Sequence, residues 1–148
     1  MNRIDYFKAK PELITQLRTL TNEQGNFQLD GKLRALIELS VSQINGCAYC
    51  VDLHSREARQ RGESQQRLDS LPVWRESPFF DDREKAALAW AESLTLIAQT
   101  HAAETEYELV RKYFSETELV ELSVAISLAN FWNRMAGGFR RMPAATQV

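Results

Sequence analysis

Apolar residues recur at three- and four-residue intervals along most of the chain, and this period constrains the fold more than any other sequence feature. The clearest example lies between Asp30 and Gly46, where the apolar positions are Leu33, Leu36, Ile37, Val41 and Ile44. Such intervals place side chains on one face of an α-helix. Asp30 is a residue type that caps helix starts, and the Asn45-Gly46 pair marks a helix end. The segment is therefore predicted to be an amphipathic helix.

Other stretches show the same period with their own start and stop signals. Pro11 can open a helix whose apolar face runs to Leu20, and a further helix is predicted from about Cys47 to Arg61. Three capping boxes pair a side-chain acceptor with an acid three residues later: Asp81 with Glu84, Thr105 with Glu108, and Ser115 with Glu118. The last box opens the longest apolar stripe, which Gly137-Gly138 ends.

Strand patterns are weak throughout, so the sequence predicts an all-α fold, a compact bundle of about six helices. The segment from 63 to 71 is expected to form a short helix at most. The segment from 72 to 80, which contains Pro72 and Pro78, is predicted to be a loop. A length of 148 residues suits a single domain over positions 1–148.

The charge pattern argues against several classes of function. The chain has 18 lysines and arginines and 20 aspartates and glutamates, a net charge of -2, without a basic stripe. A nucleic-acid-binding surface needs such a stripe, so we expect no nucleic-acid partner. No stretch approaches the roughly 18 apolar residues of a membrane span, and the N-terminus lacks the apolar region of a secretory signal. We therefore expect a cytoplasmic protein without a membrane segment.

Both cysteines and one of the two histidines lie close together in the stretch INGCAYCVDLH. Cys47, Cys50 and His54 are separated by three and four positions, so a helix that begins near Cys47 places two thiols and an imidazole on one face. The start of a helix presents unpaired N–H groups and the positive end of the helix dipole, both of which favour thiolate. Such sites lower the thiol pKa from about 8.5 to roughly 3.5–7.5.

Three uses of these side chains are open from the residues alone. In a redox site, one sulfur attacks, the other resolves, and His54 transfers protons. A zinc site is the second use, but Cys47, Cys50 and His54 supply only three ligands, and His101 lies in a separate predicted loop. The third is plain packing of two buried thiols and a histidine. In the cytoplasm a CxxC pair favours redox chemistry over a static disulfide. We expect no metal and no other cofactor.

The stretch INGCAYCVDLH resembles the active-site segment of the AhpD-like alkylhydroperoxidases, in the carboxymuconolactone decarboxylase superfamily. Cys47, Cys50 and His54 match the CxxCxxxH part of the family pattern. The resemblance extends through VWRESP, REKAALAWAESLT and FWNRMAGGF, at 73–78, 83–95 and 131–139, and so covers most of the chain. It implies an all-helical homo-oligomer, a trimer or a hexamer.

The resemblance also implies an activity, that of a thiol peroxidase or disulfide reductase in antioxidant defence. It assigns the attack on peroxide to Cys50, the resolving role to Cys47, and a part in a proton relay to His54, whereas helix position alone favours Cys47 as the more acidic thiol. In the better-known relatives the electrons come from a lipoyl-linked dithiol, so we expect a dithiol donor or a peroxiredoxin partner. The decarboxylase branch lacks the cysteine pair, which disfavours that activity here.

One position departs from the family pattern. The resemblance implies an acid twelve residues before the first cysteine, and Ala35 stands there. Glu38, one helical turn closer, is the candidate replacement, although a solvated position on the helix explains it equally well. If nothing replaces the acid, the alternative is a redox-responsive interaction or stress protein with little peroxidase turnover. On the last predicted helix, Asn133 is expected to make a helix–helix hydrogen bond, and Trp74 and Trp90 are expected to be core or interface anchors.

Overall fold

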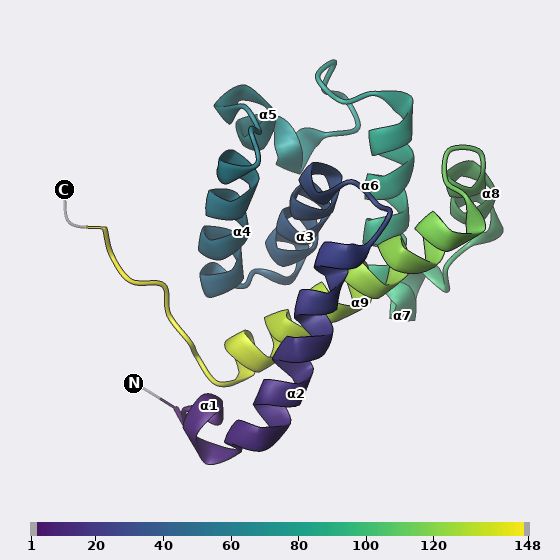
Figure 1. The fold of residues 1–148 in the computed structure, drawn as a ribbon. Coiled ribbons are helices and arrows are strands. Elements are labelled where there is room, and N and C mark those ends of the chain that lie inside the picture. Colours follow the sequence, from purple (N-terminus) through teal and green to yellow (C-terminus); the bar gives the residue numbers. More distant parts are fainter. Residues whose placement is uncertain (1–2, 147–148) are drawn as a thin grey trace.

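The computed structural model describes residues 3–146 of the chain, and all of their regular structure is helical (Figure 1). The α-helices are α1 (Tyr6–Ala9), α2 (Pro11–Asn22), α3 (Gly31–Asn45), α4 (Ala48–Gln60), α5 (Gln65–Ser70), α6 (Asp82–Thr95), α7 (Ile97–Thr100), α8 (Glu104–Arg111) and α9 (Glu116–Gly138). Two 3₁₀ turns, η1 (Glu23–Asn26) and η2 (Leu71–Val73), complete the set. The all-α prediction is confirmed, and the described helices exceed the expected six because α1, α5 and α7 are short pieces of four to six residues.

Helix α3 is central, and the most extensive helix packing in the described chain involves it together with α4, α6 and α9 (Figure 1). Its apolar stripe enters a large apolar cluster whose fully buried members include Leu36, Ile37, Leu71, Leu88, Leu122 and Ile126. Burying each such side chain stabilises the fold by about 1.5–3 kcal/mol relative to leaving it in water. Trp74 and Trp90 belong to the same cluster, which confirms them as core residues. Thr21 of α2 accepts a hydrogen bond from the Trp132 indole of α9, and Tyr6 of α1 packs against Phe139, the residue that follows α9.

The start signals read from the sequence are confirmed at three helices. The Asp30 carboxylate accepts the Leu33 N–H at 3.0 Å and caps α3, and Gly46 ends that helix with a φ of 67°. The full capping boxes of Asp81 at α6 and Ser115 at α9 are both present. These contacts fix where α3, α6 and α9 begin.

The capping box predicted at Thr105 is wrong. Helix α8 starts at Glu104, its N-cap is Ala103, and no side chain caps it. The preceding turn, with a φ of 54° at His101 and 50° at Ala102, leads the chain into the helix before Thr105 is reached. The Thr105 hydroxyl therefore lies inside the first turn, where it donates to Glu106 instead.

Two further boundaries differ slightly from the predictions. The segment predicted as a loop from 72 to 80 begins inside η2, because Pro72 fits the first turn of a 3₁₀ helix. Cys47 is the N-cap of α4 rather than a member of its first turn. Among residues 3–146, none of the helices is long and apolar enough to cross a membrane.

Candidate active site

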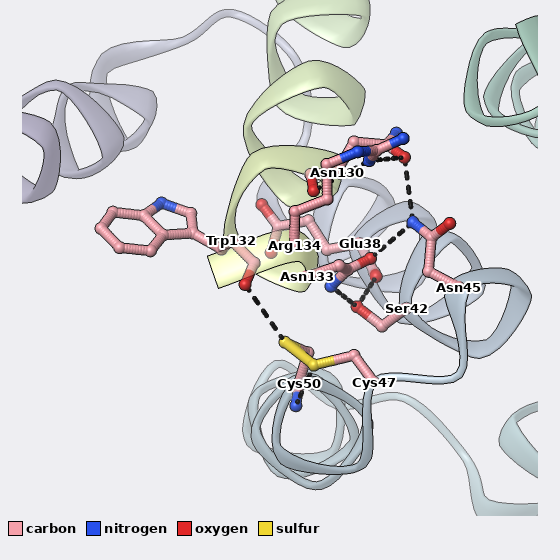
Figure 2. The surroundings of a disulfide bond; sticks show 9 residues. All are labelled: Glu38, Ser42, Asn45, Cys47, Cys50, Asn130, Trp132, Asn133 and Arg134. Atoms are coloured by element: carbon pink, nitrogen blue, oxygen red, sulfur yellow. Dashed lines mark hydrogen bonds between the residues drawn. A yellow bond between two sulfur atoms is a disulfide. The ribbon is translucent and has the colours of Figure 1, made fainter. Parts of the chain in front are cut away.

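The two cysteines are joined in a disulfide at the start of α4 (Figure 2). The N-cap residue Cys47 has extended backbone angles, and its Sγ accepts the N–H of Cys50 at 3.3 Å. The sulfur thus occupies the place that a serine or aspartate oxygen takes in an ordinary N-cap. A thiolate at this atom would face the positive end of the helix, so the local geometry stabilises negative charge on Cys47.

Helix α9 also packs against the disulfide. The Cys50 Sγ lies 4.0 Å from the backbone carbonyl oxygen of Trp132 (Figure 2). Ala136 of α9 forms a small buried cluster with the two cysteines. Beside this contact, the buried Asn133 amide donates to the Ser42 hydroxyl at 3.0 Å and accepts from Asn45 at 2.9 Å. The predicted helix–helix hydrogen bond of Asn133 is confirmed. These bonds hold α3 and α9 in register behind the sulfurs.

A cavity of about 680 Å³ opens on the Cys50 side of the disulfide. One face of α4 and its C-cap form a wall of it with Tyr49, Cys50, Leu53, His54, Glu57 and Arg61. Residues of α1, α2, η1, α3, α9 and the C-terminal segment complete the lining, but Cys47 is not among them. The cavity therefore approaches the disulfide at Cys50 rather than at Cys47.

His54 lies between two carboxylates in this cavity. Its Nδ1 is 3.3 Å from Glu38 Oε2 and 2.9 Å from Glu57 Oε2. Burial of the ring favours its neutral form, but the hydrogen bonds to Glu38 and Glu57 and the charges of both acids outweigh burial and raise the pKa of His54 to about 9. The imidazole is therefore protonated at neutral pH. Because both carboxylates face Nδ1, Nε2 is the ring nitrogen left to serve a substrate.

The carboxylates have cationic neighbours as well. Arg34 Nε lies 3.3 Å from Glu38 Oε1. Burial alone would raise the pKa of Glu57, but its hydrogen bond to His54 and the charges of His54, Arg61 and Arg34 lower it. Glu57 is thus ionised at neutral pH beside a charged imidazole.

The structure brings Cys50, His54 and Glu38 to one cavity and leaves the other candidate positions outside it. Ala35 is 2% exposed and packs in the apolar cluster. Glu38, with a side chain that is 12% exposed, is not a solvated surface residue. Asp52 forms an ion pair with Arg56 at 3.0 Å on the surface of α4.

Glu57 was missed by the sequence reasoning. Its only signal is the three-residue spacing from His54, which places both side chains on one face of the helix. That spacing also describes countless exposed ion pairs on helix surfaces. The hydrogen bond at 2.9 Å between Glu57 and His54 Nδ1, which the sequence does not show, gives Glu57 its effect on the pKa of His54.

Ligand atoms of Glu38, His54 and Glu57 lie within 4.8 Å of one another, a spacing at which a cation fits between them. The charge balance of the cluster is different from that of an open metal site, however. Arg34 already occupies one side of Glu38, and a protonated His54 holds the two carboxylates together. The zinc arrangement considered from the sequence needs free thiolates, and here the two sulfurs are bonded to each other.

Residues 11–93, more than half of the chain, match the model of the carboxymuconolactone decarboxylase family. The chain therefore belongs to this family, and its fold and CxxC pair are those of the AhpD-like proteins within it.

Individual relatives agree with this assignment. The chain is 35% identical over 134 residues to the uncharacterized protein YdfG of Bacillus subtilis strain 168, covering 90% of this chain and 91% of that one. It is similar in structure to ATU0492 of Agrobacterium tumefaciens, with a TM-score of 0.94 and 42% identity over 98% of this chain and 100% of that one. ATU0492 is a protein of unknown function described provisionally as an antioxidant defence protein AhpD. A peroxidase-related protein of Silicibacter sp. TM1040, also uncharacterized, has a TM-score of 0.82 and 27% identity over 92% of this chain and 72% of that one.

Proposed function

We propose that the protein is a thiol peroxidase of the alkylhydroperoxidase type that serves antioxidant defence and cycles between a dithiol and the Cys47–Cys50 disulfide. The observation that carries the proposal is the pairing of a closed disulfide with a cavity that Cys50 lines and Cys47 does not. Cys50 shares this cavity with the protonated imidazole of His54, an arrangement that suits peroxide cleavage. The AhpD-like relatives support the same activity class.

The first step is the attack of the Cys50 thiolate on a hydroperoxide, ROOH. The terminal oxygen is transferred to the Cys50 sulfur, the O–O bond breaks, and the alkoxide RO⁻ leaves. His54 is protonated at neutral pH and gives a proton from Nε2 to the alkoxide, which leaves as the alcohol. Glu38 and Glu57 hold the ring at Nδ1 and stabilise its charge until that transfer.

The second step closes the disulfide. The Cys47 thiolate attacks the sulfenic acid on Cys50, the S–S bond forms, and the hydroxide that leaves takes up a proton to become water. In total, two thiols and ROOH yield the disulfide, ROH and H₂O. The position of Cys47 as N-cap suits a resolving thiolate, because the Cys50 N–H already points at its sulfur.

The same geometry supports an assignment of the two sulfurs that agrees with both helix position and the family resemblance. Access from the cavity favours Cys50 as the attacked or attacking sulfur, and the helix start favours Cys47 as the thiolate that leaves. When a dithiol donor reduces the protein, its thiolate attacks Cys50 and expels Cys47, and a leaving thiolate of low pKa departs faster. In both half-reactions the external molecule reacts at Cys50, and Cys47 is the sulfur that closes or leaves the disulfide. This cycle requires a reducing compartment, and the cytoplasm is one. On α9, the apolar residues Val120 and Val124 are exposed, which suits a surface buried in a homo-oligomer.

The alternative, an interaction protein with little turnover, depended on the missing acid at Ala35. Glu38 lies 3.3 Å from His54 and offers a carboxylate where that alternative assumed none. We therefore favour the enzyme.

The cysteine variants test the proposal. Cys50→Ser is expected to abolish peroxide reduction with a dithiol donor, because no accessible sulfur remains. Cys47→Ser is expected to reduce one equivalent of cumene hydroperoxide and then stop as a Cys50 sulfenic acid, which dimedone labelling and mass spectrometry detect. Undiminished turnover in Cys50→Ser, or dimedone labelling of Cys47 in that variant, would overturn the assignment.

A further inference from the structure

The cavity at Cys50 carries a positive charge in a chain whose net charge is -2. Its lining contains four arginines, Arg18, Arg34, Arg61 and Arg141, against two carboxylates. Both carboxylates are engaged by His54, and Glu38 is engaged by Arg34 as well. Within residues 3–146, Arg34 is the one member of the four that forms an ion pair. The cavity therefore holds cations that the protein itself leaves uncompensated.

Two of these cations lie beside aromatic rings of the cavity wall. The Arg141 guanidinium carbon is 4.3 Å from the ring centre of Tyr49 and 4.3 Å from that of Phe7. The Arg18 guanidinium carbon lies 5.6 Å from the ring centre of the same Phe7. Arg141 and Tyr49 line the same cavity as Cys50.

The aromatic rings hold the arginine without neutralising it. A guanidinium stacked on two rings loses conformational freedom but keeps its charge and its fork of N–H donors. Such a fork matches a carboxylate in two parallel hydrogen bonds. Because the side chain is already ordered, a ligand that binds it does not bear that ordering cost.

Another part of the cavity wall is apolar. Leu53 comes from α4, and Leu128, Ala129 and Trp132 come from α9. The indole N–H of Trp132 is already bonded to the Thr21 hydroxyl at 2.9 Å, so the ring presents its apolar body rather than a free donor. A volume of about 680 Å³ is in the usual range for ligand pockets and exceeds what hydrogen peroxide needs.

We propose that this cavity selects organic hydroperoxides that bear a carboxylate, with the carboxylate at Arg141 and Arg18, the carbon skeleton along the apolar walls, and the peroxide group at Cys50. This inference rests on the proposed peroxidase function and names its substrate class. Arg141 is the main specificity-determining residue, and Arg18, which is exposed at the rim, assists it.

A binding experiment tests the inference without any peroxide chemistry. Isothermal titration of the oxidised protein with decanoate and with 1-decanol at pH 7 compares two ligands of equal chain length that differ in charge. We expect decanoate to bind at least about tenfold more tightly, and Arg141→Gln to remove that difference while leaving 1-decanol unaffected. Arg140→Gln is the matched control, because it removes the same charge from the neighbouring residue, which does not line the cavity.

A kinetic experiment then connects binding to the reaction. The ratio of kcat/KM for 4-(2-hydroperoxypropan-2-yl)benzoate to that for cumene hydroperoxide is expected to exceed about ten, and Arg141→Gln is expected to lower it about tenfold. Arg141→Lys keeps the charge without the planar fork, so its ratio of kcat/KM values should lie between those of the wild type and Arg141→Gln. Arg18→Gln, at an exposed position where folding is not at risk, should lower the ratio to a smaller extent.

The outcomes separate the two proposals. If neither hydroperoxide is reduced but decanoate still binds through Arg141, the peroxidase function fails and the preference of the cavity for carboxylates stands. Equal binding of decanoate and 1-decanol overturns the inference and leaves the peroxidase function intact. If Arg141→Gln slows both hydroperoxides alike, the arginine acts on the Cys50 thiol rather than on a substrate carboxylate, which also overturns the inference.

Discussion

Helix α3 has two buried faces of different chemistry, one apolar and one polar. One face carries Leu36 and Leu39, at 0% and 1% exposure, into the apolar cluster. The other carries Glu38 and Ser42, at 9% and 0% exposure, toward the cysteines and His54. The apolar face stabilises the fold wherever it meets other apolar groups. The polar face is tolerable only because α4 and α9 supply specific partners, since an unpartnered buried polar group is costly.

That difference teaches where function and stability are separated in this fold. One face of α3 stabilises the fold by apolar packing, and the other face forms a hydrogen-bonded wall of the site around the cysteines. Substitutions on the first face should act through folding, and substitutions on the second should act through chemistry or through the loss of named hydrogen bonds.

The largest expected effect on stability comes from the apolar face. Leu36→Ala should lower the free energy of unfolding by about 2–5 kcal/mol, because it leaves a cavity at a fully buried position. Chemical denaturation measures this loss. Peroxidase kcat/KM of the folded fraction should stay at the wild-type value, and a parallel loss of activity would contradict the separation of the two faces.

A pH titration of stability isolates the charged cluster at the end of the polar face. The pKa of His54 is raised from 6.5 to about 9 in the folded protein, so its stabilising effect is complete below pH 6.5 and is lost as the pH rises through about 9. The loss should be about 3 kcal/mol at most. It is measured by denaturation of the disulfide form, in which the cysteines do not titrate.

His54→Gln is the control for this titration, because it removes the titrating group. Its stability should vary less than that of the wild type between pH 6.5 and 9. An equally steep decline in the variant would show that other groups are responsible.

The polar face should also reveal itself in the rate. Glu38→Gln removes a carboxylate that contacts His54 at 3.3 Å, and we expect kcat/KM for a hydroperoxide to fall about 10²-fold, within the usual range for proton-transfer groups. Because Arg34 also loses its partner, stability falls too, so the rate is measured per folded molecule. A wild-type rate in this variant would restore the interaction-protein hypothesis.

Smaller effects test the hydrogen bonds between α3 and α9 and the helix starts. Ser42→Ala leaves the buried Asn133 amide without its acceptor and should cost about 1–3 kcal/mol, whereas Ser127→Ala, at an exposed serine of α9, should change stability by less than about 0.5 kcal/mol. Ser115→Ala should cost about 1 kcal/mol, and Thr105→Ala, which caps nothing, should be close to neutral. Thermal denaturation measures the stability of all four variants. Equal losses of stability in Ser42→Ala and Ser127→Ala would contradict the structure.

The sequence predicts the cohesive part of the fold well, because apolar periodicity and capping residues are local signals. The stripe of α3, the capping boxes at Asp81 and Ser115, and the CxxC at a helix start needed no knowledge of tertiary contacts. The Thr105 box failed because the pattern names a possible acceptor and not the residue at which the chain enters the helix.

The environment of the cysteines was much less predictable. Glu38 reads as a solvated position until α4 is known to cover it, and Glu57 reads as an ordinary surface acid. Arg141 meets Tyr49 and Phe7 only because α1 and the segment after α9 both come close to the start of α4. Pairings between residues so distant in sequence leave no periodic signal that one sequence can show.

The cap on α4 bears on how the protein changes between its redox states. The Cys50 N–H is bonded to the Cys47 sulfur in the disulfide, and a thiolate at that atom is a stronger acceptor of the same hydrogen bond. The first helical turn therefore has a partner before and after reduction. We expect two electrons to be stored and released with the backbone almost stationary, so that the reorganisation accompanying each turnover is confined to a pair of sulfur atoms.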